Sequence, residues 1–80
     1  MQNKNKKDVL LIKDILSSIE SIYEFTNEIT IEHFAKSSLI QSAVERKFEI
    51  IGEASHRVST NCKEEFNNVN WRVLKAFRNF

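Results

Sequence analysis

The side chains best suited to bind or act on a charged group lie near the end of the sequence, where three basic residues occur without an acidic residue. Arg72, Lys75 and Arg78 lie within residues 71–80, and Asn79 follows Arg78. Positive potential of this kind attracts phosphate groups. The alternative interpretation is that Lys and Arg favour the last turns of a helix because they offset its dipole. On the three charges alone, we favour this second interpretation.

Two histidines and one cysteine are the further candidates for acid–base or nucleophilic chemistry near neutral pH. His33 and His56 could each act as a base, but solvent-exposed histidine is the simpler interpretation of both. Cys62 is the only cysteine, so no disulfide forms within the chain, and no spacing of ligands predicts a metal site. We therefore expect neither a metal nor a cofactor, and a single cysteine in the sequence fits a reducing cytoplasm.

The composition predicts an all-α fold that forms one domain over residues 1–80. There is one glycine and no proline, whereas sheet proteins need turn residues every few positions. Hydrophobic residues make up 41% and charged residues 29%, as in ordinary globular proteins. No segment has the length of an apolar membrane span, and residues 1–7 lack the apolar run of a signal peptide. We expect a cytoplasmic protein that does not contact a membrane.

Periodic apolar residues predict two long helices, which we expect to pack antiparallel in an up-down bundle. The first runs from about Asp8 to Phe25, and the carboxylate at position 8 would stabilise its first-turn amides. Its apolar stripe consists of Val9, Ile12, Leu16, Ile19 and Tyr23, widened by Leu11, Ile15 and Ile22. The second runs from about Ser38 to Val58, with Leu39 on its apolar side. Its Gly52 indicates that another helix approaches closely.

Shorter elements are expected around these two helices. Thr30 would cap a short turn after a connector, and residues 63–66 would add another turn. Asn70 would cap a last helix that begins at Trp71, a core anchor, and continues with the apolar residues Val73, Leu74, Phe77 and Phe80. Because this stripe reaches the last residue without a glycine cap, we expect a last helix that is cut short and a domain incomplete at its C-terminus. We also expect a dimer or higher oligomer in which the last helix packs across a subunit boundary.

Two segments carry a resemblance to a known family. Residues 43–54 read AVERKFEIIGEA, and residues 70–79 read NWRVLKAFRN. With an aspartate near the start of the first helix, these segments make the chain similar to the HepT-like ribonuclease toxins, a branch of the HEPN superfamily of helical nucleases. The resemblance covers almost the whole chain in register.

This resemblance implies a bundle of four or five helices that forms a homodimer and cleaves RNA without a metal. It also implies a type VII-like toxin–antitoxin pair, in which a nucleotidyltransferase antitoxin modifies a tyrosine of the toxin. The family motif is an arginine, a polar residue, about three further residues, then a histidine, one residue and a tyrosine. Arg78 and Asn79 match its start, whereas the histidine and the tyrosine would fall beyond Phe80.

The resemblance assigns a catalytic role to Arg78 and an orienting role to Asn79, which could equally be an exposed helix residue. Glu53 and Arg46 are supporting candidates because of their positions on the second helix, where Arg46 could contact a phosphate. Histidine takes up and returns protons near neutral pH, whereas arginine stays protonated and can only stabilise phosphate charge. We therefore expect the 80-residue chain to be inactive by itself. Glu53 would pair with Arg78 or Arg46, either to hold a guanidinium in place or only to fix the helix register.

Two other functions stay open beside the ribonuclease. The chain could be a catalytically dead toxin remnant that acts as a dimerisation or partner-binding module. It could also be a helical protein with only a structural role in an assembly. The coding sequence downstream of position 80 discriminates between a shortened toxin and a remnant.

Overall fold

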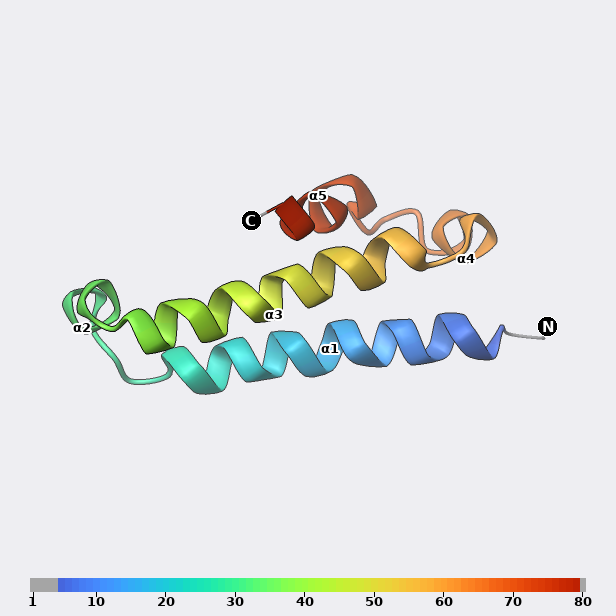
Figure 1. Cartoon of the computed structure of the whole chain (residues 1–80). Helices are drawn as coiled ribbons and strands as arrows, with labels where there is room; N and C mark the ends of the chain where they lie inside the picture. The colour runs from blue at the N-terminus through green and yellow to red at the C-terminus, as the bar shows by residue number, and fades with distance from the viewer. Residues whose placement is uncertain (1–4, 80) are drawn as a thin grey trace.

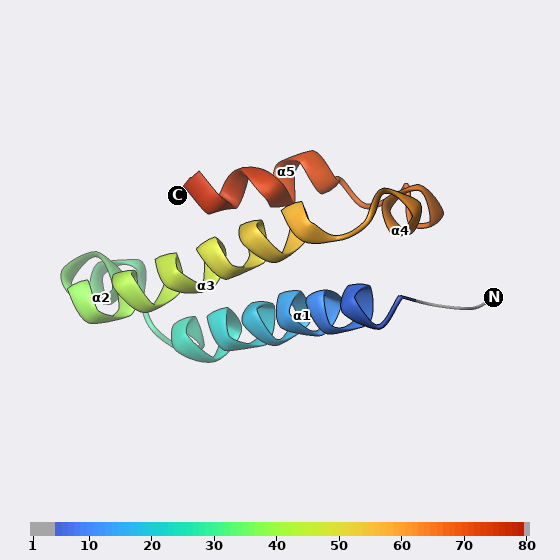
Figure 2. The same cartoon turned by 45° about the vertical axis from the view of Figure 1, so that its right-hand side comes forward.

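In the computed structural model, which describes residues 5–79, every regular element is helical (Figure 1). The elements in order are α1 (Lys6–Thr26), α2 (Ile31–Lys36), α3 (Ser38–Arg57), α4 (Thr60–Glu65), α5 (Trp71–Ala76) and a 3-10 turn, η1 (Phe77–Asn79). The two long helices, α1 and α3, run antiparallel, and α5 lies against α3 on the side away from α1 (Figures 1 and 2). The expected all-α fold with two long antiparallel helices is confirmed.

Each α-helix begins where a polar side chain accepts a hydrogen bond from a first-turn amide, which that turn cannot satisfy internally. In α1 this residue is Asn5, whose Oδ1 accepts from the amide of Lys7 at 2.8 Å. Asp8 lies in the first turn of α1, where a negative charge favours the exposed amides as expected, but the cap is Asn5, and the Asp8 carboxylate accepts its hydrogen bonds from Ser59. The other caps are Thr30, Ser37, Ser59 and Asn70. α4, which Ser59 caps, begins at Thr60, three residues before the turn predicted from residue 63.

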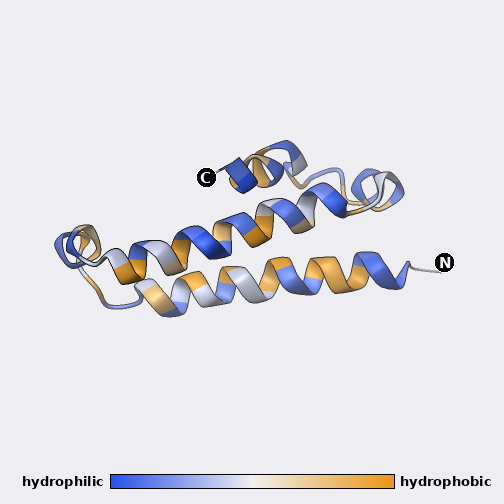
Figure 3. Cartoon of the chain, in the orientation of Figure 1, coloured by the Kyte–Doolittle hydropathy of each residue, from blue (hydrophilic) through white to orange (hydrophobic). Residues whose placement is uncertain are grey.

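The buried core lies mainly between α1 and α3. Its members are apolar side chains with little or no exposure, namely Leu11, Ile15, Ile51, Ala54, Val58 and Cys62. Figure 3 shows hydrophobic segments that recur along both long helices. Full burial of one aliphatic side chain contributes about 1.5–3 kcal/mol, so these few residues provide much of the favourable free energy of packing.

The face of α1 that meets α3 is one side of the wide apolar arc predicted for this helix, the side that was expected only to widen it. Leu11, Ile15 and Ser18 are buried, whereas Val9, Leu16 and Tyr23 are 41%, 57% and 73% exposed. Successive residues of a helix turn by about 100°, so the two sets occupy adjacent faces. Both faces are apolar, but a single neighbouring helix such as α3 can cover only one of them. Likewise Leu39, expected on the apolar side of the second long helix, is 80% exposed.

The last helix is held against α3 by aromatic side chains. Trp71, Leu74 and Phe77 pack against the core, which confirms Trp71 as an anchor. The indole Nε1 of Trp71 donates to the carbonyl of Phe66 at 3.0 Å. The rings of Phe48 and Phe77 meet edge to face with centroids 4.9 Å apart. Phe80, the end of the predicted stripe, lies outside the described residues.

Within residues 5–79, no helix combines the length and the apolar character needed to cross a bilayer.

Candidate functional site

The last turn of the chain rests directly on the backbone of α3 at Gly52. A Cβ atom placed on Gly52 would lie 2.7 Å from the Cα and 2.8 Å from the Cβ of Arg78, and closer still to the backbone nitrogen of Arg78. Contacts this short do not occur for real side chains, because the atoms would overlap. Gly52 therefore permits η1 to touch α3. The close approach expected at this glycine is confirmed, and the approaching residue is Arg78.

Contact through its backbone leaves the side chain of Arg78 exposed. Arg78 and Asn79 line an open pocket of about 300 Å³ together with Arg72, Lys75 and Ala76. No carboxylate lines this pocket, and none of its three cations forms an ion pair within the described part of the chain. Its lining offers guanidinium and ammonium donors to an anion, which suits a phosphate.

Arg46 and Glu53 belong to a different part of the surface. They line a separate open pocket of about 180 Å³ between α1 and α3, together with Asp14 and Arg57. Arg46 Nη1 lies 3.4 Å from Oε1 of Glu49, and both side chains are substantially exposed. Across residues 5–79, Glu53 forms an ion pair with neither Arg78 nor Arg46, so the expected pairing is not found.

The physical reason for this separation is the helical turn of α3. Gly52 is directed at η1, and the next residue along a helix points about 100° further around the axis. Glu53 therefore points towards the groove beside α1, where Leu11 and Asp14 also lie. Neighbours in sequence thus serve two different surfaces.

A second polar site links the start of α1 to the junction between α3 and α4. The carboxylate of Asp8 accepts hydrogen bonds from the hydroxyl of Ser59 at 2.6 Å and from its backbone amide at 2.9 Å. Asp8 is only 7% exposed. The hydrogen bond from the Ser59 hydroxyl lowers the pKa of Asp8 below its usual value, and the Ser59 amide and nearby Lys7 act in the same direction against the effect of burial.

Sequence reasoning missed this pair. A serine directly after a long helix is a recognisable cap signal, and Ser59 Oγ does accept from the amide of Cys62 at 3.1 Å. Nothing in the spacing of the sequence shows that the same hydroxyl donates to Asp8. The pair shares no lining residue with the pocket of Arg78, and its geometry serves to hold helices together.

The remaining candidates for acid–base or nucleophilic chemistry lie apart from Arg78. His33 and His56 are exposed, and neither lines its pocket. Cys62 is buried in the core. Among residues 5–79, no group of three His, Cys, Asp or Glu side chains is placed to hold a metal ion. The site at the end of the chain therefore consists of cations and one amide.

Comparison with known proteins decides the family. The sequence profile of the family described as ribonuclease HepT-like matches residues 15–80. The chain belongs to this family. The match includes α3, α5 and η1 of this HepT-like chain, and thus both Gly52 and Arg78.

Individual relatives agree with this assignment. The chain is 40% identical over 76 residues to a candidate RNase of Methanocaldococcus jannaschii, MJ1380, covering 94% of this chain and 70% of that protein. It is 40% identical over 75 residues to the probable ribonuclease HepT of Thermococcus cleftensis, covering 94% of this chain and 66% of that protein. A second M. jannaschii protein, a gamma-glutamylcyclotransferase and candidate RNase, is 38% identical over 91% of this chain.

The HepT-like chain is shorter than these relatives. It spans 33% of the gamma-glutamylcyclotransferase-containing relative, 66% of the T. cleftensis protein and 70% of MJ1380. No solved structure matches it.

Proposed function

We infer that this chain is the helical core of a HepT-like endoribonuclease toxin, in which Arg78 and Asn79 contact the scissile phosphate of RNA. The observation that supports this inference is the contact between Gly52 and the backbone of Arg78, which holds that backbone in place while the residue stays exposed. Arg72 and Lys75 add positive charge beside it, and no carboxylate of residues 5–79 lines the same pocket. Family membership supplies the class of reaction.

The reaction needs groups that transfer protons and groups that stabilise negative charge. Cleavage of RNA without a metal needs a base that takes the proton of the 2′-hydroxyl and an acid that protonates the leaving oxygen. Arg78 cannot do either, because its guanidinium stays protonated, but it stabilises the negative charge that develops on the phosphate. Asn79, the next residue, orients the same phosphate. Neither His33 nor His56 lines this pocket, so the 80 residues by themselves hold the electrostatic part of the centre and do not cleave.

Partners follow from the same proposal. The chain assembles as a homodimer, and a nucleotidyltransferase antitoxin controls the toxin in a type VII-like pair. We propose that the protein acts in the cytoplasm, a reducing compartment that suits a chain with the single cysteine Cys62.

The test is an RNA cleavage assay in the presence of a metal chelator, with the 80-residue chain and with the full product of its reading frame. We expect the full product to cleave single-stranded RNA and to leave a 2′,3′-cyclic phosphate. Replacing Arg78→Gln in it should lower the cleavage rate about 10²–10³-fold, as loss of a transition-state donor does elsewhere. The matched control is Arg57→Gln, an exposed arginine on α3 that lines the other pocket and should change the rate little.

Each other outcome overturns a named part of the proposal. Arg78-dependent cleavage by the 80-residue chain alone would contradict its inactivity. Loss of cleavage on adding the chelator would contradict the metal-independent mechanism. A full product that binds RNA or an antitoxin without cleaving RNA would replace the enzyme with the catalytically dead binding module.

A further inference from the structure

The exposed face of the last helix carries basic side chains at a regular spacing. Arg72, Lys75 and Arg78 are three residues apart, and all three are exposed. Residues three apart are neighbours on an α-helix, and in a 3-10 turn such as η1 they lie one above the other. At a rise of about 1.5–2.0 Å per residue, these side chains extend over about 10 Å. We call the three residues the basic row.

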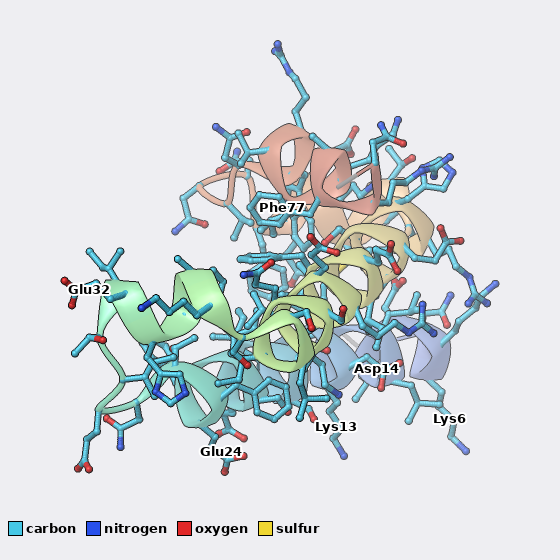
Figure 4. All side chains as sticks on the ribbon, turned by 60° about the vertical axis from the view of Figure 1, so that its left-hand side comes forward. Lys6, Lys13, Asp14, Glu24, Glu32 and Phe77 are labelled. Atoms are coloured by element: carbon cyan, nitrogen blue, oxygen red, sulfur yellow. The ribbon has the colours of Figure 1, made fainter. Side chains whose placement is uncertain are left out.

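The basic row is held in place by the apolar residues that precede its members in the sequence. Trp71, Leu74 and Phe77, each directly before one member of the row, pack against the core. Figure 4 shows Phe77 between the ribbons of α5 and α3, whereas Lys13 projects from α1 at the other side of α3. Successive residues of a helix point about 100° apart, so packing of the three apolar side chains turns the basic row towards solvent.

The helix dipole does not account for the whole row. Cations favour the last turn of a helix, where they offset the dipole, and they are unfavourable in its first turn. Arg72 is the second residue of α5 and lies in that first turn. No acidic side chain of residues 5–79 lines the pocket of the row or forms an ion pair with it. The dipole, which the sequence alone favoured as the explanation, therefore explains Lys75 but not Arg72.

The length and charge of the row fit a nucleic-acid backbone. We propose that the basic row binds the RNA strand on one side of the scissile phosphate, with Arg78 at that phosphate and with Lys75 and Arg72 at the phosphates that follow. The row is longer than one phosphate group, and its members line one open pocket, so they reach successive phosphates of a single strand. The inference rests on the proposed contact of Arg78 with the scissile phosphate. It adds Lys75 and Arg72 as substrate-binding residues.

The row contacts the backbone of the strand rather than its bases. Proteins hold unpaired bases by stacking them on aromatic side chains, but Trp71 and Phe77 are half-buried and pack against the core. Beside the three cations, the pocket is lined by Ala76 and Asn79. Phosphate contacts position a strand without reading its sequence. We therefore expect similar affinities for uridine and adenosine homopolymers.

Binding of an RNA that cannot be cut tests the row independently of cleavage. The probe is a fluorescent 2′-O-methyl oligouridine of about ten nucleotides, which keeps its phosphates but lacks the 2′-hydroxyl that attacks in cleavage. In fluorescence anisotropy with the 80-residue chain and with the full product of its reading frame, log Kd should rise with log salt with a slope of about 2. Each of three phosphate contacts contributes about 0.7 to this slope. Arg72→Gln and Lys75→Gln should each lower the slope by about 0.7 and weaken binding about 2- to 5-fold at 0.1 M salt.

Matched variants separate the row from the general charge of the protein. Arg57→Gln and Lys13→Gln remove exposed cations from α3 and α1 and should change the slope and the affinity little. Lys75→Arg keeps the charge and should bind the probe like the native chain, and far-UV circular dichroism checks that helix content is unchanged. Equal losses in the two control variants would overturn the proposal. Binding of a polyglutamate peptide as tight as that of the RNA would overturn it as well, since the surface would then be a general anion site.

Cleavage kinetics of the full product distinguish this inference from the ribonuclease proposal. Arg72→Gln and Lys75→Gln should act mainly by raising KM, because they bind the substrate and the transition state alike, whereas Arg78→Gln should lower kcat. On a dinucleotide, which has no flanking phosphate, the effect of Arg72→Gln should disappear and that of Arg78→Gln should persist. A loss in Arg72→Gln that is equal on both substrates refutes the basic row. Full cleavage by Arg78→Gln refutes the proposed catalytic contact instead, and the anisotropy measurements still decide whether the row binds RNA.

Discussion

The backbone of Arg78 lies in direct contact with Gly52 on α3, leaving no room for a Cβ atom between them. Glycine in the middle of a helix costs about 1 kcal/mol relative to alanine. This contact is the physical reason that the residue is tolerated there, since it lets η1 rest on α3.

Replacing Gly52→Ala therefore sets two effects against each other. Alanine raises the helix propensity, but its methyl group would overlap backbone atoms of Arg78. Backbone atoms cannot rotate away, so we expect a net destabilisation of about 1–3 kcal/mol in urea unfolding, together with displacement of η1. The fluorescence of Trp71, the only tryptophan, should report that displacement. Ser42→Ala, at an exposed position of the same helix, measures the gain from alanine alone; an equal gain at position 52 would contradict the close contact.

The bond between Asp8 and Ser59 predicts how stability depends on pH. Hydrogen bonding lowers the pKa of Asp8 in the folded chain, so between the folded and unfolded pKa values the unfolded chain binds more protons. The contribution of Asp8 is therefore complete above its unfolded pKa of about 3.8 and is lost as the pH falls through the lower folded pKa. Unfolding free energies measured from pH 6 to pH 2.5 should show this loss.

Removing either partner checks the same bond. Asp8→Asn and Ser59→Ala should each cost about 1.5–3 kcal/mol at pH 6, and Asp8→Asn should also flatten the decline at low pH. Asp14→Asn, an exposed aspartate on α1, is the control and should change little. Equal pH dependence in native and Asp8→Asn chains would show that another carboxylate is responsible.

The hydroxyl of Ser55 is expected to destabilise the folded chain, so its removal should have the opposite effect to removal of the Asp8–Ser59 bond. Ser55 has no exposed surface, and its Oγ has no hydrogen-bond partner among residues 5–79. A buried hydroxyl without a partner costs about 1–3 kcal/mol. Ser55→Ala should therefore stabilise the chain by about 1 kcal/mol or more, beyond the change measured for the exposed Ser42→Ala. Destabilisation would mean that the hydroxyl is satisfied in solution.

The connector after α1 contains a strained residue. Glu28 has φ of 63°, in the left-handed region, which costs a residue with a side chain about 1–2 kcal/mol. Glycine pays no such steric cost but loses more entropy on folding. Glu28→Gly should raise the midpoint of thermal unfolding, with a gain of about 0.5–1 kcal/mol. Asn27→Gly, at a neighbour with φ of −64°, should lower it; the same shift in both variants would contradict the strain at position 28.

Much of this protein follows from the sequence because the deciding forces are local. Helical spacing of apolar residues, cap residues such as Ser37 and Asn70, and the lack of proline determine where helices form. A single glycine inside α3 was enough to predict a close approach at that point, because no local preference explains it. The segments around Gly52 and Arg78 also contain the residues by which the family is recognised.

Only the tertiary structure decided which surfaces meet. Two adjacent faces of α1 are apolar, and packing on α3 buries the one with Leu11 and Ile15 while leaving Leu16 outside. Glu53 was expected beside Arg78, yet the turn of the helix directs it to another groove. Asp8 and Ser59 meet across the fold because α1 and α3 run antiparallel. Periodicity describes one helix at a time, whereas a contact between helices depends on their relative rotation and offset, which no short segment encodes.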